Sequence, residues 1–143
     1  MRGSYCLVIN VEKPSYLNVG SLGMVKIESG CYIYVGSAFN SLEARIRRHL
    51  SRDKKIHWHI DYILAHDDVN IDDVIFTIDE RRLECLISKA LENPKSIKGF
   101  GCSDCNCKSH LHYYRDVEAA KNAILNVMEE LGAEVMSLEN LKP

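Results

Sequence analysis

The segment from residue 30 to residue 50 constrains the fold most, because a strand pattern runs almost directly into a helix pattern. Its first part, Gly-Cys-Tyr-Ile-Tyr-Val-Gly-Ser-Ala, is rich in the aromatic and β-branched residues that favour strands. Its second part places Leu42, Ile46 and Leu50 four residues apart, as on one face of a helix, and Asn40 stands where it can cap that helix. The chain therefore needs a strand and an amphipathic helix that are neighbours.

Two further strand patterns precede this segment. Residues 5–11 are apolar and β-branched, and residues 24–28 alternate apolar with polar side chains. Turn signals at 20–23 and 29–30 separate the three patterns. We expect the three strands to form an antiparallel sheet joined by short turns.

The rest of the chain alternates between helix and short strand patterns. Helices are expected at 57–65, 81–92 and 117–131, and strands at 74–78 and 110–114. In the helix expected at 81–92, the inward residues would be Leu83, Leu86, Ile87, Ala90 and Leu91. The 143 residues, 46% of them hydrophobic, fit one compact domain. We predict a single α+β domain over residues 1–143, with a central antiparallel sheet flanked by helices and a short tail from about residue 133.

Charge is segregated along the chain. The net charge of −2 excludes a surface that attracts nucleic acid everywhere, so such binding would come from a local patch. A basic run supplies one: Arg45, Arg47, Arg48, Arg52, Lys54 and Lys55.

The N-terminal residues have no signal-peptide pattern, and no apolar run approaches the ~18 residues that a membrane helix needs. Cys6, Cys31 and Cys85 lie in apolar patterns that suit reduced thiols. We therefore expect a cytoplasmic protein without a membrane partner.

Two tyrosine motifs and a helix carry the functional signal. Gly3-Ser4-Tyr5 lies in the first strand, Tyr34-Val35-Gly36 ends a later one, and Arg45 and His49 follow on the helix. This arrangement resembles the GIY-YIG nuclease superfamily, with these two segments in place of its two motifs. The resemblance implies cleavage of phosphodiester bonds.

The resemblance also implies roles for individual residues. Tyr5 and Tyr34 would orient or deprotonate the attacking water, and Arg45 would hold the phosphate. His49 would assist proton transfer or phosphate binding. Glu84, on a later helix, would bind one Mg²⁺ or Mn²⁺, which suits a site with a single carboxylate and many waters.

Further segments extend the resemblance over nearly the whole chain. They are His57-Trp-His-Ile-Asp-Tyr62, Gly99-Phe-Gly-Cys-Ser-Asp-Cys105 and Ser109-His-Leu111. They resemble a narrower group of small proteins, classed as a domain of unknown function and sometimes fused to DNA-repair glycosylases. The implied partners are nucleic acid, DNA more than RNA, and a DNA-repair protein. Candidate substrate-binding residues are Gly36, Ser37, Arg48, Arg52, His57, His59 and Ser109.

Two features depart from the superfamily pattern. Tyr34 follows Tyr5 by 29 positions, which exceeds the spacing in compact members and implies an extra hairpin between the two motif strands. The late asparagine of some members has no clear counterpart, and Ser109 or His110 could fill its place. Either departure could alter catalysis.

Two clusters invite a metal interpretation. His57, His59 and Asp61 could ligate an ion, but we favour a structural use, because on a helix only His57 and Asp61 share a face. The loop pattern Cys102-x-x-Cys105-x-Cys107-x-x-His110 has zinc ligand types, yet its spacing is tight for a tetrahedron, so we expect no zinc.

Three functions stay open from the sequence. The first is a divalent-metal-dependent endonuclease, with a possible place in DNA repair. The second is an inert module of the same fold that binds nucleic acid or a repair partner. The third is a structural domain stabilised by zinc at the Cys loop.

Overall fold

The computed structural model describes residues 2–102 and 105–141. Ser103 and Asp104, part of the resemblance noted above, lie outside the described residues. The elements follow the order β1 (Gly3–Val11), β2 (Ser15–Asn18), η1 (Gly20–Leu22), β3 (Met24–Ile27), β4 (Gly30–Ala38), α1 (Leu42–Leu50), α2 (His59–Leu64), β5 (Val69–Ile78), α3 (Glu84–Leu91), β6 (Leu111–Tyr114), α4 (Val117–Glu130), β7 (Met136–Ser137) and η2 (Leu138–Asn140).

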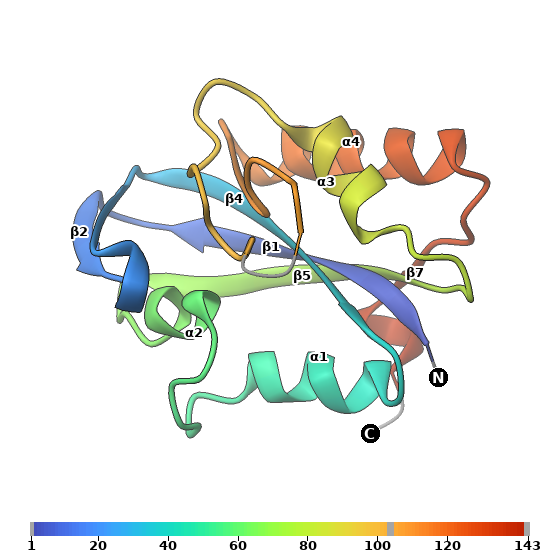
Figure 1. The fold of residues 1–143 in the computed structure, drawn as a ribbon, viewed down its shortest axis with the longest axis horizontal. Coiled ribbons are helices and arrows are strands. Elements are labelled where there is room, and N and C mark those ends of the chain that lie inside the picture. Colours follow the sequence, from blue (N-terminus) through green and yellow to red (C-terminus); the bar gives the residue numbers. More distant parts are fainter. Residues whose placement is uncertain (1, 103–104, 142–143) are drawn as a thin grey trace.

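Helices cover both faces of a central antiparallel sheet (Figure 1). Over the described residues the sheet has five strands in the order β6-β4-β1-β5-β7. Helices α1 and α2 lie on one face, and α3 and α4 lie on the other. The predicted α+β domain with a central antiparallel sheet is confirmed.

Strand β1 supplies side chains to two separate cores, because successive residues of a strand point to opposite faces. Tyr5 and Leu7 pack in the core on the side of α1 and α2. Cys6 and Val8 pack in the core on the side of α3 and α4. All four are buried, so β1 is the central strand of a three-layer structure.

The predicted three-strand sheet is wrong in one respect: β3 does not join it. Strand β3 pairs with β2 in a separate two-stranded hairpin, and β1 pairs directly with β4. The hairpin lies between the two motif strands in sequence, so the predicted insertion is confirmed. Because the hairpin lies outside the central sheet, β1 and β4 pair directly, with Tyr5 opposite Gly36 and Leu7 opposite Tyr34.

Helix α1 differs from its prediction at both ends. Ser41 caps it, since its Oγ accepts a hydrogen bond from Ala44 N at 3.3 Å. Leu42 and Ile46 are buried as expected, but Leu50 is 39% exposed. His49 takes the inward position of the last turn and is buried against the sheet.

Helix α3 begins at Glu84, three residues later than predicted. Leu83, Ile87 and Leu91 are buried in the core shared with α4, whereas Leu86 and Ala90 are exposed. Leu83, Ile87 and Leu91 follow an i, i+4 spacing and form the apolar stripe that packs in this core. Leu86 and Ala90 lie beside that stripe and face solvent.

Strand β5 is longer than predicted, and β7 forms where the sequence predicts only a tail. Strand β5 starts at Val69 and pairs with β1 along its length. Beyond residue 133, where a tail is predicted, β7 pairs with β5 and places Met136 opposite Phe76. None of the helices in the described part of the chain has the length and apolar content that crossing a membrane requires.

Candidate active site

The two motif strands bring Tyr5 and Tyr34 together. A Cβ atom at Gly36 would lie only 2.4 Å from Cζ and Oη of Tyr5, so only glycine lets the Tyr5 ring lie over β4. The ring centroids of Tyr5 and Tyr34 are 6.5 Å apart. The glycine of the second motif thus makes room for the tyrosine of the first.

Tyr5 is hydrogen-bonded to His49 on α1. The Tyr5 hydroxyl lies 2.7 Å from His49 Nε2, and both side chains are buried. Burial lowers the pKa of His49 to about 3 and raises the pKa of Tyr5 well above its usual value. Both groups are therefore uncharged at neutral pH.

A cleft of about 610 Å³ opens beside this pair. The predicted site residues that line it are Tyr5, Tyr34, Gly36, Ser37, Arg45, His57, His59 and Glu84. They come from β1, β4, α1, α2, α3 and the segment before α2. Segments far apart in sequence thus meet at one cleft.

Arg45 presents a positive charge to the cleft in a defined position. Its Nη1 donates to the Ser37 carbonyl oxygen at 3.2 Å. Its guanidinium carbon lies 4.5 Å from the centroid of the Trp58 ring, within the range of a cation–π contact. These two contacts order the side chain without neutralising its charge.

Glu84 supplies a negative charge to the same cleft. Its carboxylate accepts hydrogen bonds from the Ser37 hydroxyl and from His110 Nδ1, the latter at 2.8 Å. Burial raises the pKa of Glu84, but the hydrogen bonds from His110 and Ser37 outweigh it, so the pKa is lowered and the group is ionised. Among the described residues that line the cleft, Glu84 is the only acid.

His57 and His59, the two histidines predicted to bind substrate, differ in their surroundings. His59 Nδ1 accepts a hydrogen bond from Gly101 N at 3.1 Å, and its Nε2 lies 3.3 Å from Ser21 Oγ. It thereby ties the loop before β6 to the start of α2. His57 is exposed at the cleft.

Asp61 is fully buried and belongs to the framework of the site. It accepts hydrogen bonds from Arg48 and from the backbone N–H groups of His57 and Trp58. These contacts fix the start of α2 against α1. They fit the structural interpretation of the His57, His59 and Asp61 cluster.

Three predicted substrate-binding residues do not line the cleft. Arg48 is paired with Asp61, and Arg52 Nη2 donates to the Val69 carbonyl at 2.9 Å. Ser109 is buried, and its hydroxyl bonds to the backbone of Leu111. Their hydrogen bonds link separate segments of the chain, and a role in substrate binding stays a prediction.

The cleft has further basic and aromatic lining that sequence reasoning did not select. Phe39 is 47% exposed, and its ring centroid lies 5.3 Å from the guanidinium carbon of Arg2 and 4.9 Å from that of Arg82. Arg81 also lines the cleft. The only local signal was the Arg81-Arg82 pair just before Glu84.

The fold and the cleft define a small α+β domain with a polar site at the junction of β1, β4, α1 and α3. The chain belongs to the family described as Domain of unknown function DUF123, whose model matches residues 4–133. The match includes every cleft residue described above except Arg2. Comparison with curated proteins gave no match, and neither did comparison with solved structures.

Proposed function

We propose that this protein is a divalent-metal-dependent endonuclease of the GIY-YIG type that hydrolyses phosphodiester bonds in nucleic acid. One observation carries the proposal: Tyr5, Tyr34, Arg45 and Glu84, from four separate elements, line the same cleft. Hydrolysis of a phosphodiester needs a placed water, a cation for the phosphate and help for the leaving oxygen. In this cleft Arg45 and a cation at Glu84 would meet the phosphate, and the two tyrosines would place the water.

Arg45 would bind the reacting phosphate. Its guanidinium is ordered by Ser37 and Trp58 and faces the cleft, so little side-chain entropy is lost when phosphate binds. Arg2, Arg81 and Arg82 lie along the same cleft and would contact neighbouring phosphates. This basic rim would allow nucleic-acid binding by a chain with net charge −2.

The two tyrosines would orient the attacking water. Burial raises the pKa of both Tyr5 and Tyr34, so their hydroxyls stay protonated and act as hydrogen-bonding groups. His49 does not line the cleft and would act through Tyr5, whose hydroxyl it holds. It is therefore a positioning residue.

Glu84 fits a hard divalent cation. Its carboxylate is ionised, its side chain is 29% exposed, and Ser37 and His110 fix its orientation. A bound Mg²⁺ or Mn²⁺ would supply Lewis-acid stabilisation of charge on the phosphate. The remaining ligands would be waters and substrate oxygens, because the described cleft residues offer no second carboxylate.

The test is cleavage of a panel of duplex, single-stranded and branched DNA, with RNA counterparts, in Mg²⁺ or Mn²⁺. Glu84→Gln should abolish turnover and leave binding nearly intact. Arg45→Ala should reduce both turnover and affinity, because it removes the phosphate contact. Matched controls are Glu92→Gln, just past the end of α3, and Arg47→Ala, an exposed arginine on α1.

The outcomes separate three cases. Loss of cleavage in Glu84→Gln and Arg45→Ala, with both controls active, supports the proposal. Equal cleavage by wild type and Glu84→Gln refutes the assigned site. Binding of the panel without any cleavage by wild type favours an inert binding module of the same fold.

A further inference from the structure

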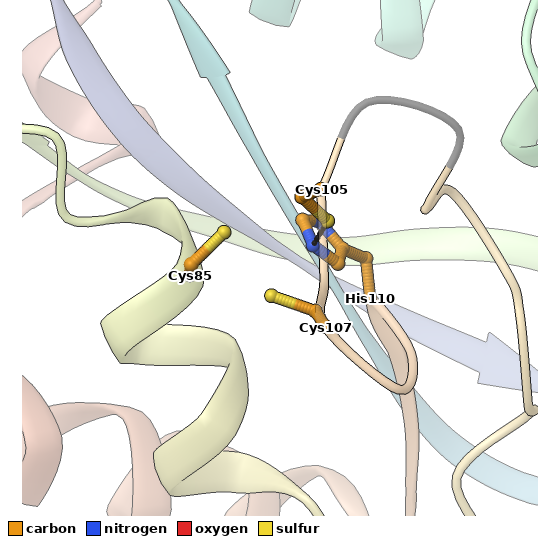
Figure 2. Close-up of side chains that lie close together, drawn as sticks. All are labelled: Cys85, Cys105, Cys107 and His110. Atoms are coloured by element: carbon orange, nitrogen blue, oxygen red, sulfur yellow. Dashed lines mark hydrogen bonds between the residues drawn. The ribbon is translucent and has the colours of Figure 1, made fainter.

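Three thiols and an imidazole gather beside the cleft, from two separate parts of the chain. Cys85 lies in the first turn of α3, and Cys105, Cys107 and His110 lie in the loop before β6 (Figure 2). One potential ligand atom from each lies within 4.8 Å of all the others. All the cysteines of this cluster are free thiols.

We propose that Cys85, Cys105, Cys107 and His110 bind a structural zinc ion. Zn–S and Zn–N bonds of about 2.3 and 2.0 Å in a tetrahedron put ligand atoms roughly 3.5 to 3.8 Å apart. A contraction of about 1 Å from the observed limit of 4.8 Å reaches this geometry. Thiolate and imidazole ligands select zinc over Mg²⁺ or Mn²⁺, which prefer oxygen.

The expectation of no zinc rested on spacing within one loop. A set made of Cys102, Cys105, Cys107 and His110 would crowd four ligands into one short turn. In the structure the fourth potential ligand is Cys85 instead of Cys102. Cys85 approaches from α3, on the other side of the cluster (Figure 2). Two elements can enclose an ion that one tight loop cannot.

His110 has the orientation of a metal-binding histidine. Its Nδ1 lies 2.8 Å from Glu84 Oε2 and 3.1 Å from the Val35 carbonyl, both acceptors, so Nδ1 carries the proton. Its Nε2 points to the thiols and lies 3.3 Å from Cys105 Sγ. A carboxylate that orients the far nitrogen of a ligating imidazole is a recurring arrangement at zinc sites.

The surroundings suit a structural centre. Cys107 and His110 are buried and Cys85 and Cys105 are half-buried, which limits access of water. Cys85 and Cys105 also line the cleft, which gives an ion a path of entry. Four protein ligands leave no open position for substrate, so the zinc would stabilise and not catalyse. It would fasten the loop to α3 and, through His110, steady Glu84.

The direct test is the metal content of protein expressed in zinc-supplemented medium and purified with reductant and without chelator. Wild type should hold about one zinc per chain, as four ligands imply. Cys85→Ser should lose it, and Cys102→Ser, a thiol of the same loop outside the set, should retain it. Cobalt loaded in place of zinc should give the intense visible bands and thiolate charge-transfer absorption of a tetrahedral site in wild type and in Cys102→Ser only.

A second measurement uses the wild-type protein, in case Cys85→Ser does not fold. Alkylation mapped by mass spectrometry should show Cys85, Cys105 and Cys107 protected by zinc and modified after chelation, with Cys102 modified equally in both states. Zinc far below one per chain, zinc lost from Cys102→Ser but kept by Cys85→Ser, or a disulfide within the set would overturn the proposal. None of these readouts depends on nuclease activity, so the two proposals can fail independently.

Discussion

Asp61→Asn tests the framework that holds α2 against α1. Asp61 is fully buried and accepts four hydrogen bonds. Oδ1 accepts one, from Arg48 Nη1 at 3.1 Å, and Oδ2 accepts three, from Arg48 Nη2 at 3.0 Å and from His57 N and Trp58 N at 2.9 Å each. Asparagine has almost the same shape but only one acceptor oxygen.

The expected change in the free energy of unfolding follows from these contacts. If the amide oxygen takes the Oδ2 position, its three bonds survive, and the amide nitrogen faces the Arg48 donor. One charge-assisted hydrogen bond is lost, which costs about 1.5–3 kcal/mol, and Arg48 loses its countercharge. The Arg48 side chain is 29% exposed, so water compensates part of that charge. We expect a loss of about 3 kcal/mol in the free energy of unfolding.

The assay is urea unfolding followed by circular dichroism, with Glu43→Gln as the matched control. Glu43 also pairs with an arginine of α1, at 2.9 Å from Arg47, but this pair is exposed and should contribute about 0.5 kcal/mol or less. A loss in Asp61→Asn no larger than that in Glu43→Gln would refute the argument from burial.

The pH dependence gives a second check. Burial raises the pKa of Asp61, but the hydrogen bonds from Arg48 and from the backbone of Trp58 and His57 outweigh it, so the folded pKa lies below 3.8. The contribution of Asp61 is therefore present above pH 3.8 and is lost as the pH falls through the folded pKa. The difference between wild type and Asp61→Asn should be constant from pH 7 to pH 5 and shrink below pH 3.8.

Two further predictions concern the tyrosine motifs. Gly36→Ala should lower the free energy of unfolding by about 1–3 kcal/mol, because its Cβ would overlap Tyr5, and an unchanged melting temperature would contradict that contact. His49 has a pKa of about 3 in the fold against 6.5 when unfolded, so its neutral form stabilises the fold above pH 6.5 and that contribution declines as the pH falls toward 3. His49→Gln should make the acid-side decline in unfolding free energy shallower, and an identical slope would argue against a buried neutral imidazole.

Local pattern was enough to predict most of the elements. The alternation in residues 24–28 and the apolar run in 5–11 predicted β3 and β1 because side-chain period depends only on local backbone geometry. The same holds for α1 and α4, whose apolar stripes recur with the helical period. The pairing of β3 with β2 was missed because β2 was not predicted and because the alternation in β3 suits a strand in either sheet.

Residue type alone does not show which intramolecular partner a charged side chain will bond to. Arg48 and Arg52 lie in a basic run typical of a nucleic-acid surface, yet they bond to Asp61 and to the Val69 carbonyl. Arg82 lies far from that run in sequence but lines the cleft. The charge of each side chain was visible in the sequence, but its partner was not.

Local sequence is enough to predict the α+β class, the two tyrosine motifs and the residue types available for chemistry, because these depend on local periodicity and side-chain identity. Which residues meet depends on how the helices and strands pack in three dimensions. The packing places Glu84 and Arg45 at one cleft, buries His49 next to Tyr5 and brings Cys85 to the loop thiols. Such contacts join residues distant in the chain, and they form only when burial of two apolar cores fixes the helices on each face of the sheet.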